Sequence, residues 1–226
     1  MIGQSVTRNS IILGLFAIIT TGLVVATASL TKDKIAEEKQ NAMKRSLLEV
    51  MPRERLDNDL LASVVELPAS DLLGTAEERQ AYVATLKNNP TGIIFQVVAP
   101  EGYGGSINLM VGITEKGEIT GVRVIPPHFE TPGLGDAIDV QKSEWIKSFN
   151  GKSLTNLNEK GWRVKKDGGQ FDAFTGATIT PRAVVDAVHK ALLYFQQHQS
   201  ELLHGSTPSK PDVAAVQQAH SKQEVH

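Results

Sequence analysis

Cysteine is absent from the sequence. Its absence excludes disulfide bonds, thiolate ligands for zinc or iron–sulfur clusters, and cysteine nucleophiles. It does not by itself indicate the redox compartment. Any oxidation or reduction that the protein carries out must therefore use a bound organic cofactor.

Aromatic residues are few, and charge of neither sign dominates. Aromatic side chains make up 5% of the 226 residues, and 23 basic residues stand against 25 acidic ones, for a net charge of -2. The sequence offers neither a broad stacking surface for bases nor the basic field that gathers nucleic acid by counterion release. We therefore expect no nucleic-acid partner. The length fits one domain of ordinary size with additional segments.

One long uncharged run lies near the amino terminus, at residues 11–30. Its twenty residues contain no charge, and a helix rising about 1.5 Å per residue would span roughly 30 Å of hydrocarbon over that length. We predict one transmembrane helix there. The alternative is a cleaved signal peptide, for which Ala26, Ala28 and Ser29 could form the cleavage site.

The orientation of this helix is not decided by the basic residues that flank it. Arg8 lies on one side of the run, and Lys32, Lys34 and Lys39 lie on the other, so the positive-inside rule gives no clear answer. Residues 1–10 form a short tail that is the easier end to leave in the cytoplasm. This favours export of the main domain.

Residues 31–90 are predicted to form a juxtamembrane helical region. Thr31 is a suitable helix N-cap, and apolar residues then recur at near-helical spacing as far as Pro52. From residue 53 onward, short apolar runs mix with acidic residues and end at the turn signal of residues 88–90.

Residues 91–204 are predicted to form an antiparallel sheet with packed helices. Apolar runs at 92–99, 107–113 and 119–125 are separated by glycine-containing turns, which is typical of an antiparallel meander. Proline and glycine make residues 128–136 a loop, a strand is possible around residues 162–164, and a helix should run from residue 181 to about residue 199. The predicted fold class is α+β, and the polar residues 205–226 are predicted to be a disordered tail.

The most informative segment for chemistry is residues 172–181, Asp-Ala-Phe-Thr-Gly-Ala-Thr-Ile-Thr-Pro. Thr180 is a good N-cap and Pro181 a preferred first helical residue, so a helix should begin here. The positive end of that helix would stabilise a phosphate placed just before it, near Thr178. Gly176 and Ala177 carry little bulk. On their spacing alone, these residues favour the alternative of an ordinary capped helix after a turn, with Thr175 and Thr178 making local hydrogen bonds.

This segment resembles the flavin-attachment sequence of the FMN-binding domain family, and Asp172 matches the acid that opens it. That family includes the G subunit of the Rnf electron transport complex and the C subunit of the sodium-pumping NADH:quinone reductase. A second match, Glu-Thr-Pro-Gly-Leu-Gly at residues 130–135, is similar to a loop of the same subunits. The chain length and the context of this loop resemble the G subunit more closely.

The resemblance implies that FMN is bound covalently, through a phosphoester on Thr178, by an FMN transferase that uses FAD. The loop at residues 130–135 would then lie against the isoalloxazine ring. The implied cofactor-binding residues are Thr175, Gly176, Ala177, Thr178, Thr180, Glu130, Thr131, Gly133, Leu134 and Gly135. No metal site and no acid–base catalytic residue are expected.

The function implied by the resemblance is electron transfer within a membrane-bound, ion-translocating oxidoreductase complex of the ferredoxin:NAD type. The chain would be a non-autonomous flavoprotein subunit of this translocase, in the bacterial inner membrane with its main domain in the periplasm. Other membrane subunits must bind NAD, because no Gly-x-Gly-x-x-Gly follows a strand. The alternatives are the C subunit of the sodium-pumping reductase, a membrane-anchored FMN redox sensor, or a structural anchor without cofactor.

Overall fold

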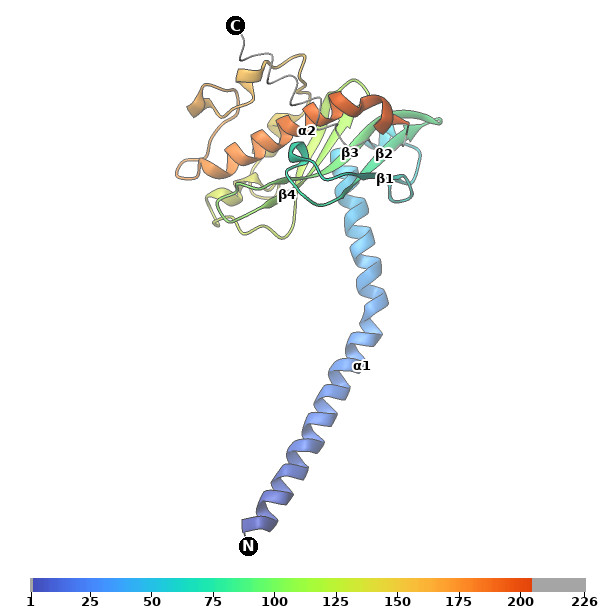
Figure 1. Cartoon of the computed structure of the whole chain (residues 1–226), viewed down its shortest axis with the longest axis vertical. Helices are drawn as coiled ribbons and strands as arrows, with labels where there is room; N and C mark the ends of the chain where they lie inside the picture. The colour runs from blue at the N-terminus through green and yellow to red at the C-terminus, as the bar shows by residue number, and fades with distance from the viewer. Residues whose placement is uncertain (1, 205–226) are drawn as a thin grey trace, which may run out of the picture. The chain divides into compact units, whose positions relative to one another are not determined.

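The computed structural model describes residues 2–204, so the predicted disordered tail lies outside the described residues. The chain divides into two compact units, the first ending at Arg45 and the second beginning at Ser46. The α+β class is confirmed. The helices and strands are α1 (Ile2–Val50), β1 (Val64–Leu67), β2 (Arg79–Leu86), β3 (Asn89–Ala99), β4 (Ile107–Thr114), β5 (Ile119–Ile125) and α2 (Ile179–Leu203) (Figure 1).

Helix α1 is one continuous helix rather than a membrane helix followed by a separately capped one. Thr31 does not cap a helix, since its Oγ1 donates to the carbonyl of Thr27 at 2.8 Å, as mid-helix threonines do. From Arg8 the helix is long and apolar enough to cross a membrane, and its apolar window has a mean hydropathy of 2.4. Large apolar side chains along this part of the helix are exposed, Ile18 at 72%. These properties suggest a membrane anchor.

The sheet contains five antiparallel strands in the order β1-β2-β3-β4-β5. The three predicted strands are confirmed as β3, β4 and β5. The prediction of a helical region over residues 31–90 is wrong beyond Val50, because β1 and β2 lie within it. Strand β1 has only four residues, and β2 buries the consecutive residues Ala81 to Ala84. An apolar run of this length does not distinguish a strand from a helix by its periodicity.

Helix α2 packs on one face of the sheet and closes the core there (Figure 1). The aromatic rings of Phe95 on β3 and Tyr194 on α2 meet edge to face, with centroids 5.9 Å apart. The helix is longer than predicted at both ends. It buries a stripe of apolar residues against the sheet, including Val184, Val188, Ala191, Leu192 and Phe195.

The last turn of α1 belongs to the second unit and packs against β4 and β5. Val50 is fully buried, and its carbonyl accepts a hydrogen bond from the Thr120 hydroxyl. Glycine is required on both strands at this contact. A Cβ on Gly112 would lie 2.4 Å from the Val50 carbonyl oxygen, and one on Gly121 would lie 3.0 Å from the Val50 Cα.

The connection from β5 to α2 consists of loops and short 3-10 helices. The predicted strand around residues 162–164 is wrong, because Val164 forms only an isolated bridge with Phe171 between two 3-10 turns. Trp162 is buried against Phe171. Trp145 packs on Phe174 with ring centroids 5.1 Å apart, and its Nε1 donates to the Asp172 carbonyl at 2.7 Å. These contacts anchor the segment that leads into α2.

Candidate functional site

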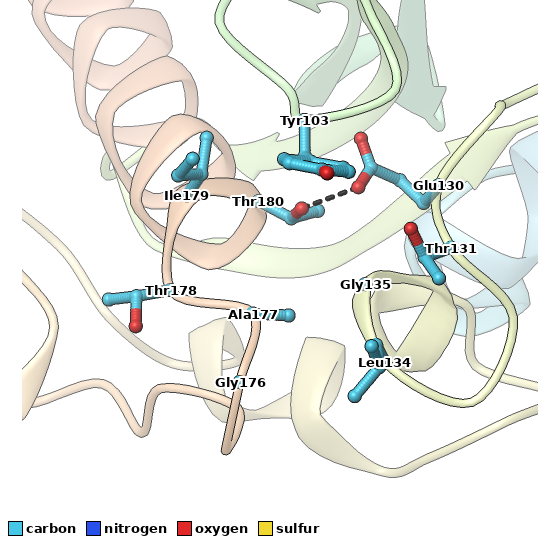
Figure 2. A pocket seen from close by; sticks show the side chains of 10 residues that line it. All are labelled: Tyr103, Glu130, Thr131, Leu134, Gly135, Gly176, Ala177, Thr178, Ile179 and Thr180. Carbon is cyan, nitrogen blue, oxygen red and sulfur yellow. Dashed lines mark hydrogen bonds between the residues drawn. The ribbon is translucent and has the colours of Figure 1, made fainter.

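A cavity of about 400 Å³ lies where three segments of the second unit meet. One segment is the turn between β3 and β4, another is the loop after β5, and the third is the start of α2. Small-molecule sites commonly have volumes of about 300 to 1,000 Å³. The residues that line the cavity are Tyr103, Glu130, Thr131, Leu134, Gly135, Gly176, Ala177, Thr178, Ile179 and Thr180 (Figure 2).

The cavity brings together the two motifs that the sequence singled out, although more than forty residues separate them. Figure 2 shows residues 176–178 on one side and Thr131 with Leu134 on the other. Of the predicted site residues, only Thr175 and Gly133 do not line this cavity. Each of these two occupies a turn that shapes one wall, and both are exposed.

Two similar turns set the opposing walls. Ala177 N–H donates to the Phe174 carbonyl at 3.1 Å, with Gly176 at a φ of 81° as the third residue of the turn. Leu134 N–H donates to the Thr131 carbonyl at 3.1 Å, with Gly133 at a φ of 76°. A type II turn requires a positive φ at this position, which glycine adopts without strain.

Thr178 occupies the N-cap position of α2, but its side chain makes no capping hydrogen bond. The residue is half-buried and lines the cavity. Its backbone carbonyl accepts from the Arg182 N–H at 3.3 Å, which closes the first turn of the helix. The hydroxyl therefore stands at the positive end of a 25-residue helix without a capping role.

The prediction that Thr180 caps α2 is wrong. The helix begins at Ile179, so Thr180 lies within its first turn, and Pro181 is the third helical residue rather than the first. Thr180 is fully buried, and its Oγ1 donates to Glu130 Oε2 at 2.5 Å. Its hydroxyl joins two segments fifty residues apart.

Glu130 is buried, with 5% of its surface exposed, and it links all three segments that form the cavity. Its Oε1 accepts from the Gly104 N–H at 3.0 Å, and its Oε2 accepts from Thr180. We call Glu130, Gly104 and Thr180 the Glu130 clasp. Glycine makes room around it, because a Cβ on Gly135 would lie 2.5 Å from Glu130 Oε2 and one on Gly102 would lie 2.8 Å from Oε1.

Tyr103 and Ile179 line the cavity but were not among the predicted site residues. Tyr103 is 69% exposed, and its ring lies beside Glu130 and Thr180 in Figure 2. The sequence could have indicated Tyr103 as a site residue, because it is an aromatic residue flanked by glycines in a predicted turn, where it is not needed for the core. Ile179 is 48% exposed. The sequence could have indicated Ile179 as a site residue, because it lies at the start of α2 and outside the apolar stripe that packs against the sheet.

The start of α2 also determines which backbone donors could hold a phosphate. The first N–H groups of a helix have no intrahelical partner. Pro181 has no N–H, and the Arg182 N–H is already bonded to Thr178. The backbone donors nearest Thr178 are therefore the N–H groups of residues 179 and 180.

The chemistry of the cavity fits FMN. A hydroxyl and a helix start suit a phosphate, while Leu134, Ile179 and Tyr103 offer apolar and aromatic surface for a flat ring. The space above the Gly176 turn is open, since a Cβ there would meet only Leu134 Cδ2, at 3.6 Å. Among the described residues, no group of three or more histidine or acidic side chains is placed to hold a metal ion.

Asp172 and the histidines at positions 128 and 189 lie outside the cavity. Asp172 is exposed and pairs with Lys165, with Oδ1 2.7 Å from Nζ. His128 does not line the cavity, and its Nε2 lies 4.0 Å from Asp139 Oδ2. His189 stacks on Trp162, with ring centroids 5.3 Å apart, and burial lowers the pKa of His189 below its ordinary value of 6.5.

Comparison with known proteins matches both parts of the chain. Residues 102–193 match the FMN-binding domain family, and residues 1–50 match the RnfG N-terminal region. Both segments that carry the sequence motifs lie within residues 102–193.

Full-length relatives are also similar. The chain is 50% identical over 200 residues to the G subunit of the ion-translocating oxidoreductase complex of Pseudomonas aeruginosa, covering 88% of this chain and 93% of the relative. The G subunit of the Vibrio cholerae complex is 47% identical over 204 residues, covering 90% and 97%. That of Shewanella piezotolerans is 45% identical over 210 residues, covering 93% and 98%. The chain therefore belongs to the family of G subunits of ion-translocating oxidoreductase complexes, with an FMN-binding domain.

Proposed function

We propose that Thr178 carries FMN through a phosphoester and that the chain relays electrons within an ion-translocating complex of the ferredoxin:NAD type. The observation that carries this proposal is the position of the Thr178 hydroxyl. It makes no capping hydrogen bond, and it stands at the positive start of α2 in a cavity whose opposite wall is the residue 130–135 loop. The relatives are named as G subunits, which supports this role over that of the C subunit or a redox sensor.

Attachment requires a phosphoryl transfer to Thr178. In this transfer the Thr178 Oγ1 would displace AMP from the FMN phosphorus of FAD, so that the new oxygen–phosphorus bond replaces the pyrophosphate bond. The hydroxyl proton would pass to a base on the transferase. The new phosphodiester retains one negative charge, which the N–H groups of residues 179 and 180 and the helix dipole would stabilise.

The cavity walls would hold and orient the ring. When bound, FMN supplies one- and two-electron chemistry without any metal or thiol, in keeping with the absence of cysteine. Thr131, Leu134 and Gly135 would contact it from the loop, and Gly176 and Ala177 would allow its close approach. Thr175 and Gly133 would not contact the ring but would shape the two turns that form the cavity walls. Tyr103, which is exposed at the turn between β3 and β4, would cover the ring from a third side.

The proposed setting is the bacterial inner membrane. Residues 11–30 would span it, residues 1–10 would remain in the cytoplasm, and the domain at residues 91–204, extended by β1 and β2, would lie in the periplasm beside other subunits of the complex. Because the chain has no cysteine, single cysteines can report this topology. A membrane-impermeant maleimide added to intact spheroplasts should label Ser106→Cys and spare Ser5→Cys. The reverse pattern would contradict the orientation, and a mature chain starting near residue 30 would contradict the anchor.

The attachment residue is tested with the Thr178→Val variant. Valine keeps the shape and β-branching of threonine but lacks the oxygen that forms the ester. Full-length protein, produced together with its transferase and denatured on a gel, should lose flavin fluorescence. Thr175→Val is the matched control, because Thr175 is an exposed threonine three residues away, and it should keep at least part of its fluorescence. A fluorescent Thr178→Val band would exclude Thr178 as the attachment residue.

A further inference from the structure

We propose that Glu130 is a positioning residue that also keeps the reduction potential of the bound flavin low, by placing a buried negative charge on the cavity wall. This inference rests on the proposed function of the cavity. It concerns the Glu130 clasp, in which one carboxylate holds both the turn between β3 and β4 and the start of α2.

The positioning role follows from the two hydrogen bonds of the carboxylate. Gly104 N–H can only donate, and Thr180 donates from the first turn of α2, two residues beyond Thr178. Glu130 thus fixes the start of the helix against the loop that forms the opposite wall. Both partners are donors, which suits an ionised carboxylate, because that group only accepts.

The electrostatic role follows from what surrounds the carboxylate. Among the described residues that line the cavity, Glu130 is the only one with a formal charge. It is 5% exposed, so water screens it little. A charge in such a site makes further negative charge nearby less favourable. Reduction adds electrons to the ring, and Glu130 therefore disfavours the reduced state relative to the oxidised one.

The test removes the charge while keeping the shape. In Glu130→Gln, the amide oxygen can still accept from Gly104 N–H, and the amide NH₂ can donate to the Thr180 oxygen. Glu101→Gln is the matched control, because Glu101 is an exposed carboxylate at the same turn. The measurement is the midpoint potential of the full-length, flavin-bearing protein in detergent, followed by its absorbance during titration with redox dyes.

We expect Glu130→Gln to keep its covalent flavin and to favour the reduced state about tenfold more than the native protein does. For a two-electron couple this is a rise of about 30 mV. Glu101→Gln should match the native potential. A Glu130→Gln protein that retains flavin at the native potential would overturn the electrostatic role. A native protein without any covalent flavin would instead contradict the proposed function, so the two failures are distinguishable.

The positioning role is tested separately at the other end of the clasp. Thr180→Val keeps the charge and removes the hydroxyl, so the fraction of chains carrying flavin should fall while the potential of those that do stays near the native value. Thr180→Ser retains the hydroxyl and should restore the yield. An unchanged yield in Thr180→Val would overturn the positioning role.

A second pair of variants carries the electrostatic test if Glu130→Gln does not fold. Leu134 lies on the same wall and is 41% exposed, so the surface should accept polar replacements there. Leu134→Glu and Leu134→Gln have nearly the same shape and differ by one charge. Leu134→Glu should have the lower potential. Equal potentials would mean that charge on this wall does not influence the flavin.

Discussion

Replacing Thr180 with valine should destabilise the fold more than the loss of a helix cap would. Valine fills the same volume in a fully buried position, so the change creates no cavity. It does remove the 2.5 Å hydrogen bond to a buried carboxylate. Hydrogen bonds to charged groups contribute about 1.5 to 3 kcal/mol, and the Glu130 oxygen would be left buried without this donor. A lost N-cap typically costs about 1 kcal/mol.

We therefore expect the free energy of unfolding to fall by about 2 to 3 kcal/mol. For a domain of this size, each kcal/mol lowers Tm by about 2 to 4 °C. Both tryptophans of the chain, Trp145 and Trp162, lie in the second unit, so their fluorescence reports unfolding of that unit in the flavin-free, full-length protein.

Two controls isolate the hydroxyl. Thr180→Ser keeps the donor and loses one methyl group, which should cost about 1 kcal/mol. Thr178→Val removes a hydroxyl without a capping bond from the same helix start, and should change stability by less than about 0.5 kcal/mol. A Thr180→Val protein that is as stable as Thr178→Val would refute the contribution of this hydrogen bond, and so would equal losses of stability for serine and valine at position 180.

Two further predictions concern packing and pH. Gly135→Ala should lower the free energy of unfolding by about 1 to 3 kcal/mol, because the new Cβ would lie 2.5 Å from Glu130 Oε2 and 3.0 Å from Thr180 Oγ1. Gly135 is not a positive-φ glycine, so left-handed backbone strain does not add to this cost, and an unchanged free energy of unfolding in denaturant melts would contradict the steric cause. Burial lowers the pKa of His189 below 6.5, so the folded protein binds fewer protons than the unfolded chain, and stability should fall as pH drops from about 6.5 toward the lowered value. His189→Gln should flatten this part of the pH profile while the exposed control His204→Gln should not, and parallel profiles for both variants would refute the assignment.

The sequence was sufficient for the features that depend on local patterns. Strands β3, β4 and β5 have strong apolar runs between glycine-containing turns, and both walls of the cavity follow from motifs rich in glycine and threonine. It was insufficient where distant contacts decide the structure. Strand β1 is short and β2 is continuously apolar, and the pairing of β2 with β3 and of β1 with β2 determines their conformation.

The start of α2 was also mispredicted because of a distant contact, in this case one made by a single residue. Thr180 followed by proline is a good local cap signal, but a buried carboxylate fifty residues away takes its hydroxyl, and the helix begins earlier. Tyr103 was missed for a related reason. Nothing in its own turn indicates that Glu130 will hold that turn beside α2 through Gly104.

The packing of Val50 against the sheet has a practical consequence for producing the domain without its anchor. Helix α1 ends at Val50, so a cut at Pro52 would look natural from secondary structure alone. It would remove Leu47, Val50 and Met51, all fully buried, and leave the surface beside Gly112 and Gly121 bare. A soluble fragment should therefore start at or before Ser46, so that it retains the final turn of α1, which covers that face of the sheet.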